Sequence, residues 1–137
     1  MSELQRVPDK ALDFDSDLTF ALNGAPFTGI AYEESPSLGL SEIEYRDGVQ
    51  EGVARDWWPS GVLKGESEHV RNTLHGASRG YDDSGRLRVV ANYEYGVLVR
   101  KESFGSDGSL IGVEQLDPDS GAATLLSRYR ALYEWPL

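Results

Sequence analysis

A period of 24 residues runs through the middle of this chain and constrains its fold more than any other feature. Gly52 and Gly76 are one period apart, and so are Gly61 and Gly85. A unit of this length is a single supersecondary element that buries its apolar side by stacking on its neighbours. Three columns keep the same step, which shortens to 23 residues in the last unit: Tyr45/His69/Tyr93, Trp57/Tyr81/Phe104 and Leu63/Leu87/Leu110.

Each unit reads as a β-hairpin. Runs of strand length lie between turns rich in Gly, Asn, Ser and Asp, the residues that tight turns favour. The sequence therefore predicts one domain over residues 1–137, mainly all-β, with a single-layer antiparallel meander of hairpins over residues 17–116. Residues 17–33 are expected to add a hairpin that turns at 23–26, whereas residues 1–15 carry little pattern.

The end of the chain has a different periodicity. Asp119 and Ser120 are residue types that cap helix N-termini. Apolar residues then recur at helical spacing, which predicts an amphipathic helix over roughly 121–134, within a capping segment 119–135. We expect it to cover the apolar face or the open end of the sheet, because exposed strand edges invite aggregation.

Alternation along the predicted strands assigns side chains to faces. The Trp57/Tyr81/Phe104 column with its leucine neighbours is expected to form a structural spine. Glu42, Glu44, Glu66 and Glu68 align on one face, and we place Asp56, Trp58, Asp82 and Glu94 with them or near them. This carboxylate cluster is either a solvated outer face or a surface for a basic partner.

The overall charge points to the same kind of partner. The chain has 23 acidic and 13 basic residues, for a formal net charge of -10. Such a field repels nucleic acid and anionic membranes and attracts basic molecules, although it also serves plain solubility. No apolar run reaches the length of a signal peptide or a membrane span, so we expect a soluble cytoplasmic protein.

Catalytic and metal-binding patterns are weak. The chain has no cysteine and two histidines, of which His69 is expected to fill a packing slot and His75 to lie at the surface. Two histidines among scattered carboxylates are fewer than the three or four ordered ligands of a zinc site. Phosphate-binding loops and complete calcium loops are missing from the sequence. We therefore predict no enzyme activity, no metal and no cofactor.

The repeat units resemble those of the MORN-repeat-variant (YwqK-like) antitoxins over roughly residues 20–116. The resemblance rests on Pro26-Phe-Thr-Gly29, Trp57-Trp-Pro-Ser-Gly61-Val-Leu-Lys, His75-Gly76 and the terminal elements Tyr45-Arg-Asp-Gly48 and Tyr93-Glu-Tyr-Gly96. His69-Val-Arg-Asn72 is a degenerate copy, and residues 33–40 depart from the pattern. The resemblance implies an immunity protein that neutralises a cognate toxin, often a deaminase or nuclease.

The charge and the resemblance together predict an antitoxin that occludes the active site of a basic, nucleic-acid-targeting toxin. Trp58 is the expected hot spot, since tryptophan often anchors protein interfaces. Reversing the charges of Glu66 and Glu68 should slow association and leave the fold intact. The alternative is a general scaffold or interaction module. The predicted partner-binding residues are Glu42, Glu44, Asp56, Trp58, Glu66, Glu68, Asp82 and Glu94.

Overall fold

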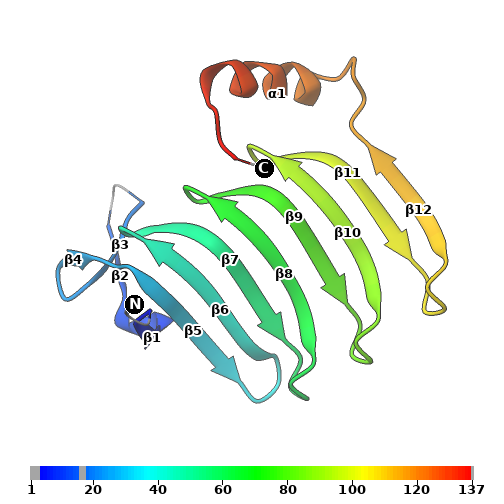
Figure 1. Cartoon of the computed structure of the whole chain (residues 1–137). Helices are drawn as coiled ribbons and strands as arrows, with labels where there is room; N and C mark the ends of the chain where they lie inside the picture. The colour runs from blue at the N-terminus through cyan, green and yellow to red at the C-terminus, as the bar shows by residue number, and fades with distance from the viewer. Residues whose placement is uncertain (1–3, 16–17, 137) are drawn as a thin grey trace.

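The structure, a computed structural model, describes residues 4–15 and 18–136 and is dominated by one open sheet of nine strands (Figure 1). From β5 onward each strand pairs antiparallel with the next, which confirms the predicted meander. The first strand pairs parallel to β5, so the sheet is mixed rather than purely antiparallel. In spatial order the strands are β1 (Arg6–Pro8), β5 (Gly29–Ser35), β6 (Gly39–Arg46), β7 (Val49–Trp57), β8 (Leu63–Val70), β9 (Thr73–Tyr81), β10 (Leu87–Glu94), β11 (Val97–Phe104) and β12 (Leu110–Gln115).

The turns of the backbone recur with the same period as the sequence. At one end of the strands, two-residue turns at Asp47-Gly48, Arg71-Asn72 and Tyr95-Gly96 have positive φ at both positions, as type I′ hairpin turns require. At the other end, Gly61, Gly85 and Gly108 have φ of +92°, +84° and +86°. The residues of the predicted spine do pair across strands, as Trp57–Leu63, Tyr81–Leu87 and Phe104–Leu110. None of the six is buried, however, and Leu110 is 52% exposed, so they do not form the core.

The shortened last unit has a structural cause in a β-bulge. Glu44 of β6 lies opposite three residues of β7, centred on Gly52, and Glu68 of β8 lies opposite three residues of β9, centred on Gly76. In the β10–β11 pair, the corresponding bulge has a single unpaired residue, Val99 of β11. The residue that the last unit lacks is therefore lost from the bulge, and the strands on either side keep their pairing.

A small three-stranded sheet covers the N-terminal end of the main sheet. It consists of β2 (Asp13–Phe14), β3 (Phe20–Leu22) and β4 (Ala25–Pro26) and follows the short 3-10 helix η1 (Asp9–Ala11). Of the predicted turn at 23–26, Asn23 and Gly24 form the turn, whereas Ala25 and Pro26 form β4. The second strand of the predicted hairpin is much shorter than expected, because residues 29–35 pair with β6 instead; position 17 lies outside the described residues. Phe27, Ala31 and Tyr45 form the buried core beneath this cap.

The C-terminal helix α1 (Gly121–Leu132) begins where predicted. The Ser120 hydroxyl accepts the Ala123 N–H at 3.1 Å, as an N-cap does. The helix ends at Leu132, so residues 133–135, which were predicted to be helical or capping, instead run extended back toward the sheet.

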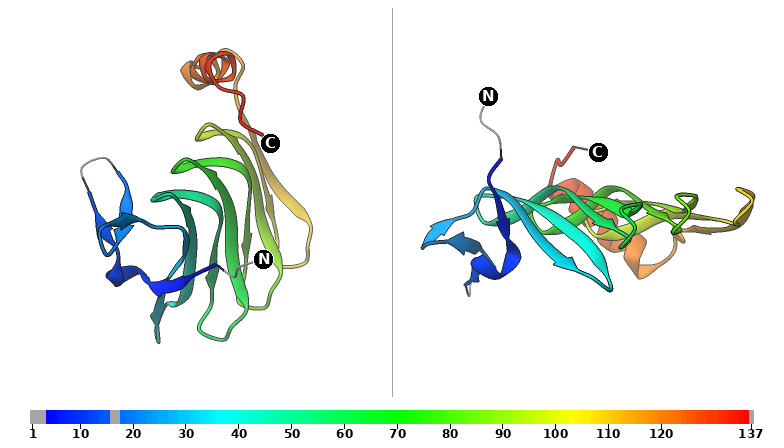
Figure 2. Two further views of the ribbon diagram at one scale, coloured as in Figure 1. Left: turned by 60° about the vertical axis from the view of Figure 1, so that its left-hand side comes forward. Right: turned by 90° about the horizontal axis from the view of Figure 1, so that it is seen from below.

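The helix does not cover the open end of the sheet. It lies across the ends of β10 and β11, and β12 remains the free edge (Figures 1 and 2). Its packing stripe is narrow, since Leu126 is buried whereas Leu125 and Leu132 are exposed. Within the described residues, no helix combines the length and the apolar character needed to cross a lipid bilayer.

Candidate functional site

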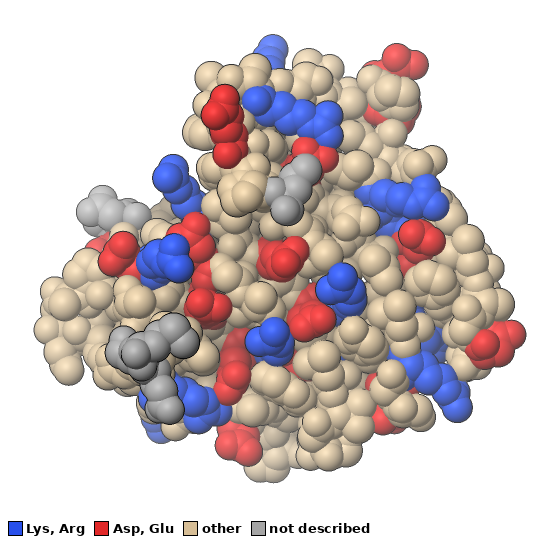
Figure 3. All heavy atoms as spheres, viewed as in Figure 1, with Lys and Arg blue, Asp and Glu red and all other residues tan. Residues whose placement is uncertain are grey.

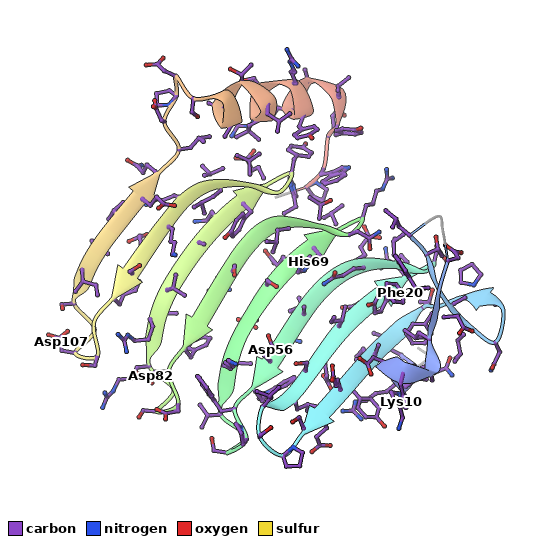
Figure 4. The ribbon with its side chains drawn as sticks, turned by 180° about the vertical axis from the view of Figure 1, so that it is seen from behind. Lys10, Phe20, Asp56, His69, Asp82 and Asp107 are labelled. Atoms are coloured by element: carbon purple, nitrogen blue, oxygen red, sulfur yellow. The ribbon has the colours of Figure 1, made fainter. Side chains whose placement is uncertain are left out.

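The main sheet has two chemically different faces. The charged face carries a row across neighbouring strands that is formed by Tyr32, Glu42, Arg55, Glu66, Arg79, Val90 and Glu102. The small-residue face carries the next row, which includes Ala31, Ala54, Ser67, Ser78 and Ala91. Figure 3 views the charged face, and Figure 4 views the sheet from the small-residue face.

Strand register divides the eight predicted binding residues among three places. Those on the charged face are Glu42, Glu44, Glu66, Glu68 and Glu94, as alternation along β6, β8 and β10 requires. Asp56 lies on the small-residue face, opposite Ser41 and Gly65, and accepts a hydrogen bond from the Ser41 hydroxyl (Figure 4). Asp56 was expected with or near the glutamates, but it lies on the opposite face from Glu66, because Glu66 pairs with Arg55.

Arginines separate the carboxylates on the charged face. The Arg55 and Arg79 side chains approach Glu66 at 3.3 and 3.6 Å from its two sides, and Arg6 reaches Glu42 at 2.9 Å. Acidic and basic side chains therefore interleave over the central strands (Figure 3). Because each ion pair cancels part of the local field, the middle of this face is less negative than the glutamate columns alone suggested.

Glu44 and Glu68 have a structural role that follows the repeat. Each carboxylate lies over the glycine of a bulge, Gly52 and Gly76 respectively, in space that a Cβ atom would otherwise fill. A Glu68 carboxylate oxygen also accepts the Ala77 N–H at 2.8 Å. These glutamates therefore close the bulges, and their equivalence at a step of 24 residues reflects this role.

Two further predicted residues hold the fold together. Arg130 of α1 contacts Glu94 with both Nε, at 2.9 Å, and a terminal nitrogen. These hydrogen bonds lower the pKa of Glu94 below its usual value. Asp82 lies in the β9–β10 turn and accepts the Ser84 and Arg86 N–H groups at 3.0 Å each, and the Arg86 N–H bond in particular lowers its pKa.

Trp58 lies in the turn between β7 and β8, at the ends of the strands, away from the glutamate cluster with which the sequence grouped it. Its indole N–H donates to the Tyr81 carbonyl at 3.3 Å, and the Lys64 ammonium stands 4.7 Å from its ring centroid. Asp82 and Arg88 occupy the same two positions one unit later, where they form an ion pair at 3.6 Å. Trp58 thus ties one unit to the next while keeping part of its ring accessible.

An aromatic hollow opens beside Trp58, at the edge of the charged face. Its walls come from the β5–β6 turn, the β7–β8 turn and the strand ends between them: Glu34, Ser35, Pro36, Gly39, Leu40, Trp57, Trp58, Pro59 and Gly61. The sequence interpretation missed this hollow because it treated Trp57 as a spine residue only and gave Glu34 no role. Alternation along β5 and β6 already placed Glu34 and Leu40 on the face of Glu42.

The net charge is unevenly distributed along the sheet. Residues 1–70 contain 14 acidic and 5 basic side chains, whereas residues 71–137 contain 9 acidic and 8 basic ones. We call the first part, with β1 and β5–β8, the acidic half, and the second part, with β9–β12 and α1, the neutral half. The aromatic hollow belongs to the acidic half, where the excess of acidic side chains is greatest.

The two histidines are structural. His75 is 3% exposed, which contradicts the predicted surface position: the C-terminal tail brings the Trp135 ring to 5.3 Å, and the histidine Nδ1 accepts the Tyr95 N–H at 2.9 Å. His69 is half-buried opposite Gly52 and Leu74, and burial lowers its pKa. Among residues 4–15 and 18–136, no group of three or more acidic or histidine side chains converges as metal ligands.

Comparison with solved structures finds distant likeness to known proteins. No family model matches the chain, and no curated protein matches it. A crystal structure of accessory secretory protein 1, 2 and 3 in Streptococcus pneumoniae aligns with a TM-score of 0.40 and 16% identity. The alignment covers 85% of this chain and 20% of that one, so this chain spans about a fifth of its length.

Proposed function

We propose that this protein is an immunity protein that binds a basic, nucleic-acid-targeting toxin in the cytoplasm and occludes its active site. The observation that carries the proposal is the charge division of the sheet, which gives the acidic half 14 acidic and 5 basic side chains. An enzyme that holds nucleic acid needs basic residues for the phosphates. An inhibitor that presents carboxylates to those residues competes with the phosphates for the same side chains.

The aromatic hollow gives the proposed interface an anchoring point. Trp57 and Trp58 supply ring faces, and Glu34 supplies a carboxylate beside them. This combination suits a long cationic side chain, because a lysine or arginine can lie against the rings and reach the carboxylate. Lys64 already occupies such a position over Trp58 at 4.7 Å. The proposed binding surface is therefore the hollow with the exposed Glu34 carboxylate of β5, rather than the centre of the glutamate columns.

An inhibitor that occludes an active site should abolish activity at one molecule per toxin molecule. The protein encoded immediately upstream is the first partner to test, with its nucleic-acid-modifying activity measured while this protein is titrated in. We expect a 1:1 complex by size-exclusion chromatography and activity that falls to the background at one equivalent. Failure of the two proteins to associate at micromolar concentrations would contradict the proposal.

A scaffold or interaction module is the second candidate, and the ion pairs of the charged face favour it. Arg55, Arg79 and Glu66 satisfy one another across three strands, which is what a face that remains solvated needs. A scaffold would bind its partner without abolishing the partner's activity. The titration above separates the two functions, because a scaffold complex retains activity at saturation.

A further inference from the structure

The outer edge of β5 is covered over only part of its length. β1 pairs with residues 30–32, and no other described strand pairs with this edge, so β5 continues past its partner (Figure 1). After Pro8 the chain turns into η1 and then joins the core on the small-residue face. Burial changes where the pairing stops, since Glu33 and Glu34 are exposed whereas the residues of β5 before them are not. We call residues 33–35 the open segment of β5.

The backbone of the open segment is directed outward at Glu34. Upstream in the same strand, the Ile30 N–H donates to the Gln5 carbonyl, outside β5, at 2.7 Å. Because N–H groups alternate in direction along a strand, those of Tyr32 and Glu34 point the same way. Tyr32 lies opposite Pro8 of β1, whereas no described strand lies next to Glu34. The N–H and carbonyl groups of Glu34 are therefore available to a strand added at this edge.

Arg6 shows how a basic side chain on a strand outside β5 meets the charged face. Arg6 lies on β1, and its guanidinium carbon stands 4.0 Å from the centroid of the Tyr32 ring on β5. Its Nε then reaches the Glu42 carboxylate of β6 at 2.9 Å. A cation from the edge strand thus crosses β5, stacks on an aromatic ring and ends on a carboxylate.

The next row of the charged face lacks such a cation. It runs from Glu34 of β5 to Leu40 of β6 and Trp57 of β7, and these three residues also line the aromatic hollow. No ion pair among the described residues involves Glu34. A strand added along the open segment would place a side chain at the outer end of this row, beside Glu34. A lysine or arginine there can pair with Glu34 and extend over the hollow, because opposite charges on neighbouring strands attract.

The charges of the open segment select the kind of strand that can pair with it. Carboxylates on an edge discourage pairing with another acidic edge, including that of a second copy, and attract a basic strand. We propose that the basic toxin binds by adding an extended segment to the edge of β5 beside Glu34, with a lysine or arginine of that segment over the aromatic hollow. This inference rests on the proposed function and adds to it the mode of binding.

Two substitutions at position 34 separate the backbone contact from the charge. Glu34→Ala removes the carboxylate alone, whereas Glu34→Pro also removes the outward N–H, which an edge strand can lose without losing a bond of its own sheet. Gln115→Pro is the matched control at the opposite edge. There the Leu116 N–H donates to the Val99 carbonyl of β11 at 2.9 Å, so the Gln115 N–H points away from the sheet as well.

Isothermal titration calorimetry with the protein encoded immediately upstream measures the dissociation constants. We expect Glu34→Ala to raise the dissociation constant about fivefold and Glu34→Pro to raise it about tenfold further, because the N–H contact is then lost as well. Gln115→Pro should bind as the wild type does. Circular dichroism checks that each variant folds.

Amide hydrogen exchange of the wild-type protein decides the matter if Glu34→Pro does not fold. Followed by NMR, exchange of the Glu34 N–H should slow about tenfold or more in the complex. A complex that Glu34→Pro weakens no more than Glu34→Ala does, or one in which the Glu34 N–H exchanges at its free rate, would overturn strand addition and leave the proposed function standing. If the wild-type protein forms no complex at all, both are overturned.

Discussion

At the scale of single residues, this fold depends on pairs that recur one period apart. Glu44 and Glu68 each place a carboxylate over the glycine of a bulge, at Gly52 and Gly76. In the next unit Asn92 replaces the glutamate, and the bulge it would have covered has lost a residue. The glutamate and the full-length bulge are thus lost together, as expected when a side chain and a backbone distortion depend on each other.

Glu68→Ala tests this structural role. Removing the carboxylate leaves the Ala77 N–H to water alone, and we expect the free energy of unfolding to fall by about 1 kcal/mol. Urea denaturation measures this loss. Glu114→Ala, which changes the charge equally at an exposed position of β12, should leave the stability unchanged. Equal stabilities for both variants would mean that Glu68 does not support the bulge.

The lowered pKa of His69 predicts a pH dependence of stability. Burial disfavours the charged imidazole, so the unfolded chain binds a proton at a higher pH than the folded chain does. Stability is therefore full above the unfolded pKa of about 6.5 and decreases as the pH falls below it. His69→Tyr restores the residue type of the Tyr45/Tyr93 column, and it should lose less stability between about pH 7.5 and 5.5 than wild type does. Parallel pH profiles for the two proteins would refute this assignment.

At the scale of elements, the C-terminal helix and tail are fastened at a few points. Arg130 pairs with Glu94, and the Tyr95 hydroxyl donates to the Tyr133 carbonyl at 2.9 Å while accepting the Trp135 N–H at 3.3 Å. The Trp135 ring then lies 4.9 Å from that of Tyr95. The Tyr95 hydroxyl thus holds the tail after α1 against the sheet, where the tail helps to bury His75.

Tyr95→Phe should release the tail without unfolding the sheet. The variant keeps the ring and loses both hydrogen bonds of the hydroxyl, so we expect amide hydrogen exchange in residues 133–135 to accelerate about tenfold. Mass spectrometry of the exchanged protein measures this, and peptides from β7 and β8 provide the internal control. If the tail exchanges at the wild-type rate, its attachment does not depend on this hydroxyl.

The elements could be predicted from the sequence more completely than their relations could. The 24-residue period fixed the hairpins of β7 to β12, and helical spacing with Ser120 fixed the start of α1. Alternation within a strand says which side chains share a side, but it does not align the sides of neighbouring strands. For that reason Asp56 was placed with Glu66, although the register puts Asp56 opposite Gly65. The burial of His75 depends on Trp135, 60 residues later in the chain, which no local pattern reports.

At the scale of the whole molecule, the sheet is electrostatically polar along its length. The acidic half carries the aromatic hollow, and the neutral half carries the open edge β12.

The central claim is that the field of the acidic half guides a basic protein to the hollow. Glu34→Lys and Glu114→Lys change the net charge equally, at exposed positions in the acidic and neutral halves respectively. Stopped-flow association with the protein encoded upstream, measured over a range of salt concentrations, tests the claim most directly. We predict that Glu34→Lys lowers the association rate about tenfold at low salt, while Glu114→Lys has a much smaller effect and added salt narrows the difference. Equal rates for the two variants, or association that does not depend on salt, would contradict it.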